Sequence, residues 1–149
     1  MMGGMRISAK ADYAIRVLLE LAADTSGPIT CEAVASTQDI PPRFIKAVIR
    51  DLRAAGLVRS QRGCEGGYWL ARDAGTITVR DAVAAVDGEH LSIRGEPRPA
   101  VAYHGTAGHL ADFWSDVEAQ LTLVLRATTI AQLLAGTDRA AGQPERNTR

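Results

Sequence analysis

The sequence predicts a mainly helical fold that carries one small β-hairpin and ends in a long helix. Three observations lead to this expectation. In most of the chain, apolar residues recur with the three- and four-residue spacing of amphipathic helices. One stretch, "LVRSQRGCEGGYWLA" (57–71), instead resembles two strands around a glycine-containing turn. Between residues 110 and 128, apolar residues follow the spacing of a two-helix seam.

The length and composition are those of a globular protein. The 149 residues, of which 46% are hydrophobic, can form one domain plus an extension. There is no charged leader followed by an apolar stretch, and no apolar run long enough to span a bilayer. We therefore expect a soluble, cytoplasmic protein with no membrane partner. The two cysteines, Cys31 and Cys64, are too few for a disulfide scaffold or a four-cysteine zinc site.

Two helices are predicted in the first part of the chain. Ser8 is a suitable N-cap for the first helix, which runs to about Ala23. The stretch "DTSGP" (24–28) ends this helix, since Gly and Pro interrupt helical structure. Thr30 then caps a short second helix over about residues 31–37.

The third predicted helix begins at Pro41 or Pro42, because proline is tolerated in the first turn of a helix. Its apolar residues share one face and are predicted to be buried: Phe44, Ile45, Val48, Ile49 and Leu52. Its basic residues recur every three or four positions and form an exposed basic ridge: Arg43, Lys46, Arg50 and Arg53. Gly56 is the residue expected to end the helix.

A β-hairpin is predicted next, with strands "LVRSQ" and "YWLA" around the turn "RGCEGG". Thr78 and Asp81 then have the spacing of a capping box for a fourth helix, over about residues 79–86 and ended by Gly88. Residues 89–108 show no sustained periodicity. We interpret them as a loop and a candidate sensing region.

The long helix spans about residues 109–127 in this prediction. Its seam predicts a dimer interface formed by Leu110, Trp114, Val117, Leu121 and Val124. Phe113 and Leu125 widen the apolar stripe, so part of the helix is expected to cover its own domain as well.

The chain ends in a short helix and a polar tail. Thr129 and Gln132 form a capping box for the short helix, which ends near Ala135. The tail lacks apolar residues to bury and is predicted to be disordered. The predicted units are therefore a DNA-binding domain, a loop, a dimerisation segment and the tail: residues 5–88, 89–108, 109–136 and 137–149.

Charge is distributed unevenly along the chain, although the formal net charge is zero. Residues 41–72 contain seven basic and two acidic residues, whereas residues 80–123 contain three basic and seven acidic ones. A helix with an apolar back and a cationic front fits the major groove of DNA, and the hairpin after it would be a wing. This order predicts a winged helix-turn-helix domain whose DNA contacts are Arg43, Lys46, Arg50, Arg59, Arg62, Gly66 and Gly67.

Four stretches carry a family resemblance: "MRISAKADYAIRVLLELA", "IPPRFIKAVIRDLRAAGLVRSQRGCEGGYWLARD", "ITVRDAVAAVDG" and "LTLVLRATTIAQLLAG". Together they resemble the winged-helix transcriptional regulators that include IscR, NsrR and CymR. The resemblance implies a homodimer, most often a repressor, that binds a palindromic double-stranded DNA operator. It also implies that the long helix crosses to the partner, that Lys46 reads bases and that Arg62 enters the minor groove.

Many members of that family carry three cysteines between the fourth helix and the long helix, and these cysteines ligate an iron–sulfur cluster. Residues 88–109 of this chain contain no cysteine, and a cluster needs several converging ligands. We therefore expect no cofactor, and the signal stays open. One hypothesis is an unknown small-molecule effector held by the loop together with Tyr103 and Trp114.

Three other interpretations remain. Cys64 could make the protein a redox-responsive regulator, since it follows Arg62 closely in the turn. The histidines His90, His104 and His109 could make it metal-responsive, but their spacing matches no metal motif, and no metal site is predicted. The winged helix could also be an adaptor that binds protein instead of DNA. No phosphate loop or catalytic set indicates an enzyme.

Overall fold

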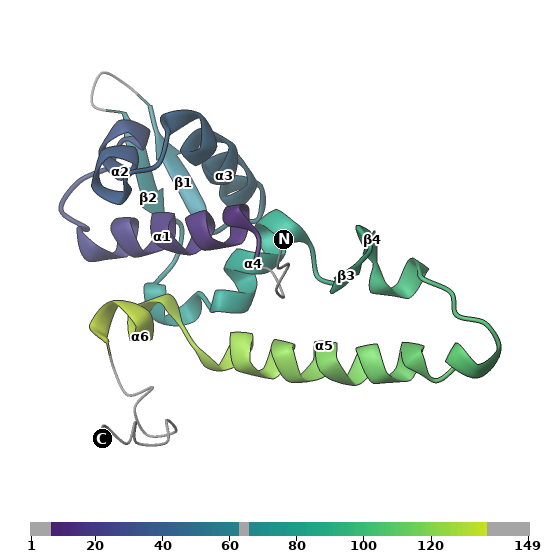
Figure 1. Cartoon of the computed structure of the whole chain (residues 1–149). Coiled ribbons are helices and arrows are strands. Elements are labelled where there is room, and N and C mark those ends of the chain that lie inside the picture. Colours follow the sequence, from purple (N-terminus) through teal and green to yellow (C-terminus); the bar gives the residue numbers. More distant parts are fainter. Residues whose placement is uncertain (1–6, 63–65, 137–149) are drawn as a thin grey trace, which may run out of the picture.

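The computed structural model describes residues 7–62 and 66–136. The helices pack against one another, a hairpin projects at one end, and the long helix α5 runs along the opposite side (Figure 1). The main elements are α1 (Ala9–Ala23), α2 (Cys31–Gln38), α3 (Pro42–Ala54), β1 (Val58–Gln61), β2 (Gly67–Leu70), α4 (Val79–Asp87), β3 (Ser92–Ile93), β4 (Glu96–Pro97), α5 (Leu110–Ala127) and α6 (Ile130–Ala135). The fold class predicted from the sequence is confirmed.

The helices begin where the capping residues predict. The Ser8 side chain accepts a hydrogen bond from the Ala11 N–H at 3.0 Å, and the Thr30 side chain accepts one from the Ala33 N–H at 3.1 Å. Both capping boxes, at the starts of α4 and α6, are formed. Gly56 follows α3 with φ +76°, a conformation that glycine adopts without steric cost.

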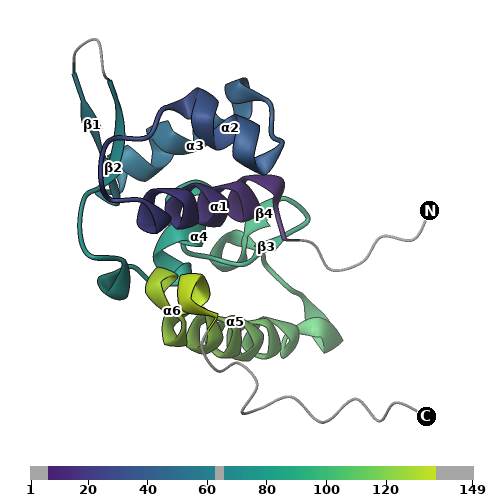
Figure 2. The ribbon, with the colours of Figure 1, turned by 90° about the vertical axis from the view of Figure 1, so that its left-hand side faces the viewer.

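The core is formed where α1, α3, α4 and α6 meet. Its largest fully buried side chains come from both ends of the chain: Leu18, Ile45, Ile49, Leu52, Ile77 and Ile130. Ile130 belongs to α6, so the C-terminal helix completes the core that α1 begins. Figure 2 shows α6 close to α1 and α4, beyond the end of α5.

The hairpin β1–β2 is attached to the loop that precedes α2. Ile29 and Tyr68 form an antiparallel bridge, in which the Ile29 N–H donates to the Tyr68 carbonyl at 3.0 Å and the Tyr68 N–H donates to the Ile29 carbonyl at 2.8 Å. Gly67 lies so close to this loop that a Cβ atom there would be 2.9 Å from the Ile29 oxygen. The hairpin is therefore held by contacts among three chain segments, β1, β2 and the loop at Ile29.

The segment 89–108 contains more regular structure than the predicted loop. It forms a small hairpin, β3–β4, with an Arg94–Gly95 turn in which both residues have positive φ, +53° and +80°. Such a turn matches the twist of paired strands. Strands of two residues have no detectable periodicity, which is why the sequence did not predict them.

Helix α5 has no buried residue, although much of its surface is apolar. Leu110, Phe113, Leu121, Leu123 and Val124 are exposed large hydrophobic side chains. No helix in the described ranges is both long enough and apolar enough to cross a membrane.

Candidate nucleic-acid interface

The basic ridge of α3 points to solvent. Its four members, Arg43, Lys46, Arg50 and Arg53, are all exposed, whereas Ile45, Val48, Ile49 and Leu52 on the opposite side are buried. The Arg50 side chain is 77% exposed, and its Nε atom forms a long ion pair of 3.9 Å with the Asp51 carboxylate, which solvent weakens. Within residues 7–62 and 66–136, the other three ridge residues form no ion pair. The ridge therefore presents nearly its full positive charge.

The sequence-based prediction that Phe44 is buried was wrong, because its side chain is 41% exposed. Phe44 lies in the first turn of α3, where its ring packs beside the Tyr13 ring with 6.2 Å between centroids. The Arg43 guanidinium lies 4.7 Å from the centroid of the Phe44 ring. A cation over an aromatic face is stabilised, so Phe44 positions the first residue of the ridge.

The wing, β1–β2, presents a second group of cationic and polar side chains. Arg59 and Trp69 are partners in the strand register, and the Arg59 guanidinium lies 5.3 Å from the Trp69 ring centroid. The Trp69 indole N–H donates a hydrogen bond of 2.8 Å to the Gln61 side chain. Arg62 follows β1 directly and is exposed. This face is thus ordered by side-chain contacts within the wing.

The wing is also fixed relative to α3. The Leu57 N–H donates to the Leu52 carbonyl, and the Ala71 N–H donates to the Leu57 carbonyl, each at 3.0 Å. Figures 1 and 2 both place the hairpin beside α3 at the same end of the molecule. The basic ridge and the wing arginines therefore belong to one rigid surface.

The glycines of the wing tip differ in their surroundings. Gly66 is partly buried, whereas Gly67 is buried against the backbone of Ile29. The close approach that Gly67 permits is thus made to the protein's own chain, and a phosphate contact there stays a prediction. Cys64, the candidate redox residue, lies outside the described residues.

Cys31 and Tyr68 connect α2 with the wing. Cys31 is only 4% exposed and packs as a small apolar residue of the core. Burial raises the pKa of the Cys31 thiol, and the hydrogen bond with Tyr68 and the charge of Lys46 only partly oppose that rise. The thiol is therefore protonated at neutral pH and is a poor nucleophile. Burial also raises the pKa of the Tyr68 hydroxyl.

The predicted dimer seam lies on the open side of α5. Leu110, Leu121 and Val124 are exposed, whereas Trp114 and Val117 are partly covered. The Phe113 and Trp114 rings pack edge to face with centroids 5.2 Å apart, which continues the apolar surface. Leu125 lines a cavity between α5 and α4, and Leu121 also borders it, so Leu121 lies where the two sides of the helix meet. Helix α5 thus has one apolar side toward its own domain and another toward solvent.

The three candidate histidines have different surroundings. The His90 Nδ1 atom is 2.9 Å from the Glu118 carboxylate, which also accepts a hydrogen bond from the Arg98 guanidinium. His104 directly precedes a short helical turn, Gly105–Ala107, and His109 directly precedes α5. In the part of the chain that the structure describes, no three His, Cys, Asp or Glu residues are grouped as a metal site.

The Glu118 cluster, formed by Glu118, His90 and Arg98, was missed by sequence reasoning. Its members are 20 and 28 residues apart along the chain, a separation that leaves no local spacing signal. Burial raises the pKa of Glu118, but the hydrogen bonds from Arg98 and His90 outweigh this effect and hold the pKa below its ordinary value.

Comparison with known families gives a match over nearly the whole described chain. Residues 7–136 match the Rrf2 family, described as "Iron-dependent Transcriptional regulator". The Mycobacterium tuberculosis protein Rv1287 is 39% identical over 133 residues, which cover 89% of this chain and 83% of the relative. The HTH-type transcriptional regulator IscR of Cronobacter sakazakii is 31% identical, with 87% of this chain and 80% of the relative covered.

Solved structures show the same arrangement. The structure of CymR, the global cysteine regulator of Bacillus subtilis, has a TM-score of 0.71 at 27% identity and covers 91% of this chain and 100% of that one. The structure of T. potens IscR has a TM-score of 0.72 at 27% identity and covers 95% and 94%. The fold described above is therefore similar to those of two transcriptional regulators.

Proposed function

The chain belongs to the Rrf2 family and is a DNA-binding transcriptional regulator, and we propose that it represses transcription as a homodimer on a palindromic operator. The observation that carries the proposal is the division of the molecule into two functional ends. The basic ridge and the wing form one exposed cationic surface, and the open apolar side of α5 lies away from it (Figure 1). One end suits a duplex and the other suits a second subunit.

The proposed DNA contacts divide into two classes. Arg43, Lys46 and Arg50 enter the major groove, where Lys46 reads base edges because it is exposed at the centre of the ridge. Arg59 and Arg62 contact the phosphate backbone or the minor groove through the wing. The aromatic rings of Phe44 and Trp69 hold two of these cations, which reduces the entropy lost when they bind DNA.

The proposed homodimer rests on the composition of α5. Helix α5 has 18 residues and no buried side chain, so it adds no residue to the hydrophobic core of its own subunit. Large exposed apolar patches on a protein surface mark sites of association. A pair of α5 helices packed along Leu110, Trp114, Val117, Leu121 and Val124 would cover this surface. Two recognition helices would then lie about 34 Å apart, or a multiple of that distance.

The residues of this chain do not fit the iron–sulfur cluster that the family resemblance suggests. Residues 88–109 contain no cysteine. Cys31 is buried beside Tyr68 with a raised pKa, and no other cysteine lies in the described ranges. We therefore propose a regulator without a cluster. Protein purified without air is expected to be colourless, and visible absorption that disappears on oxidation would contradict this proposal.

Selection of bound fragments from random duplex DNA tests the function. The expected result is an enriched sequence with two-fold symmetry, bound with an affinity that falls as salt increases. Enrichment of an asymmetric sequence would contradict the homodimer on a palindrome. The absence of any salt-dependent duplex binding would favour an adaptor that binds protein.

A further inference from the structure

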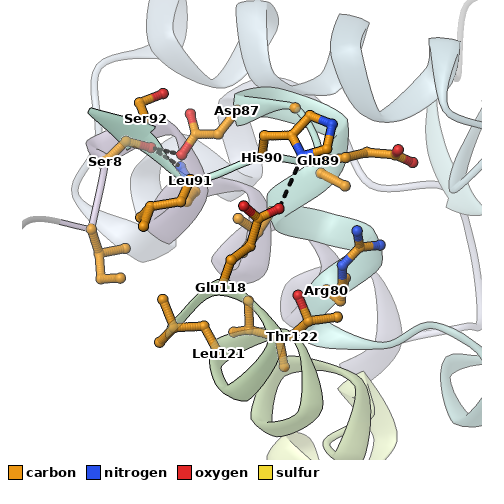
Figure 3. A pocket seen from close by; sticks show the side chains of 16 residues that line it. Ser8, Arg80, Asp87, Glu89, His90, Leu91, Ser92, Glu118, Leu121 and Thr122 are labelled. Carbon is orange, nitrogen blue, oxygen red and sulfur yellow. Dashed lines mark hydrogen bonds and ion pairs between the residues drawn. The ribbon is translucent and has the colours of Figure 1, made fainter. Parts of the chain in front are cut away.

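A cavity lies between the DNA-binding domain and α5 (Figure 3). Its walls come from the start of α1, the end of α4, the segment that leads into β3, and the inner side of α5. Its volume is about 410 Å³, within the range of sites for small organic molecules. Neither Tyr103 nor Trp114, the residues suggested by the sequence for an effector, lines this cavity.

Most of the wall is apolar. Ala11, Val83, Leu91, Leu121 and Leu125 contribute hydrocarbon surface from four separate segments. A molecule that occupied the cavity would therefore need an apolar body to gain from its burial.

Two carboxylates of this wall, the partly buried Glu118 and the exposed Asp87, have hydrogen-bond partners. Glu118 accepts hydrogen bonds from His90 and Arg98, and Asp87 accepts one from the Ser8 hydroxyl at 2.5 Å. Figure 3 shows two of these contacts as dashed lines, Ser8–Asp87 and His90–Glu118. Glu89 also borders the cavity but is exposed to solvent. The carboxylate that is covered, Glu118, is thus paired with cationic side chains, whereas Asp87 and Glu89 are open to solvent, which screens their charge.

Arg80, in contrast to these carboxylates, is a charged residue of the cavity wall without a partner among the described residues. It lines the cavity from α4 and is partly buried. Among the described residues, its guanidinium takes part in no hydrogen bond or ion pair, unlike Arg72 and Arg98 on either side of it in the chain. A guanidinium offers planar paired donors that match a carboxylate, and covering it from water without such a partner is costly.

We propose that this cavity binds a small organic acid with an apolar body, such as a medium-chain or aryl carboxylate. The carboxylate pairs with Arg80, and the hydrocarbon part packs against Val83, Leu91, Leu121 and Leu125. The effect on transcription rests on the proposed function: Leu121 also belongs to the dimer seam, so an occupant that displaces α5 alters the spacing of the two recognition helices and the affinity for the operator.

Binding is tested first without DNA, by titration calorimetry of the full-length protein with octanoate and phenylacetate. Octanamide, phenylacetamide and octylamine are the neutral and cationic controls. We expect a carboxylate to bind at least tenfold more tightly than its amide, and the amine to bind no better than the amide. Failure of both carboxylates to bind, or equal binding of acid and amide, would overturn the proposal.

Two variants assign the binding to the cavity. Arg80→Gln should weaken carboxylate binding at least tenfold, and its folding can be verified by an unchanged melting temperature because Arg80 makes no bonds that the structure shows. Ala84→Met fills the cavity while leaving Arg80 in place, and it should also weaken binding. Arg16→Gln, in an exposed ion pair of α1 outside the cavity, is the matched control. Unchanged affinity in both cavity variants would overturn the assignment.

The regulatory effect is measured separately, as affinity for the selected operator with and without the bound carboxylate. A change of about tenfold is expected in the parent and none in Arg80→Gln. An operator affinity that does not respond to the bound acid would overturn the regulatory part. If the protein binds the acid but no duplex, the proposed function fails while the cavity assignment stands.

Discussion

Thr78 and Thr129, the N-cap residues of α4 and α6, face each other in an antiparallel backbone bridge. The Val79 N–H donates to the Thr128 carbonyl, and the Ile130 N–H donates to the Ile77 carbonyl, each at 2.9 Å. The C-terminal end of α5 is thereby attached to the start of α4. A displacement of α5 is therefore transmitted to the domain that carries the basic ridge.

Ile130→Ala tests this attachment. Ile130 is fully buried, and truncation of a buried isoleucine leaves a cavity and removes hydrophobic burial. We expect the free energy of unfolding to fall by about 2–5 kcal/mol in urea denaturation. Leu134→Ala on the same helix is the control, since Leu134 is 45% exposed and should cost much less. Equal losses in the two variants would show that α6 does not complete the core.

Lys46→Ala and Arg59→Ala should weaken DNA binding in different ways. Lys46→Ala is expected to change which operator sequences are preferred, because a base contact costs about 1–3 kcal/mol at one position only. Arg59→Ala should weaken binding to all sequences and reduce the salt slope by about one. Quantitative binding to a set of single-base operator variants at several salt concentrations separates the two. A uniform loss for Lys46→Ala would contradict its role in base reading.

The dimer seam is tested by Val124→Asp. Val124 is 55% exposed on the open side of α5 and does not line the cavity, so a charge there should disrupt subunit association without disturbing the core. Sedimentation should show a monomer, with operator affinity reduced along with dimerisation. Ala119→Asp adds the same charge at an exposed position of α5 that belongs neither to the seam nor to the cavity wall, and it should stay dimeric. A dimeric Val124→Asp variant would mean that the seam lies elsewhere.

Acid should destabilise the protein partly through Glu118. Its pKa is lower when folded than its ordinary value of 4.5. A carboxylate of this kind contributes stability above its unfolded pKa and loses that contribution as the pH falls through its folded pKa. Glu118→Gln should therefore cost about 1–3 kcal/mol at neutral pH and flatten the loss of stability below pH 4.5. Urea unfolding across this pH range is the measurement, with the exposed Asp116→Asn as control.

Gly67→Ala should displace the wing. The added Cβ would lie 2.9 Å from the Ile29 carbonyl oxygen, so one of two backbone segments must move. Such overpacking costs about 1–3 kcal/mol, and the amide resonances of Ile29 and Tyr68 should shift. Gly27→Ala is the matched control, because a Cβ atom at Gly27 would have no neighbouring atom within 4 Å. If the two variants have equal stability, the bridge between Ile29 and Tyr68 is not rigid.

The parts of the fold that depend on local chemistry could be predicted from the sequence. An N-cap side chain bonds to the backbone only three residues later, so the sequence alone identifies these helix starts. They were predicted correctly at Ser8, Thr30, Thr78 and Thr129. The exposed basic ridge followed from helical periodicity in the same way.

Features that join distant segments could not be predicted. Phe44 has the spacing of a core residue, yet its exposure depends on Tyr13, far back in α1. The Glu118 cluster and the cavity around Arg80 require the return of α5 onto α4, for which no short motif exists. Their members are identified only when the tertiary structure is known.

The small hairpin between α4 and α5 is closed at its own base, where the Arg98 N–H donates to the Leu91 carbonyl at 2.8 Å. Its entry and exit strands thus leave the molecule at neighbouring points. Because the two ends of this segment adjoin, the β3–β4 hairpin can be exchanged or lengthened without moving the basic ridge and the wing.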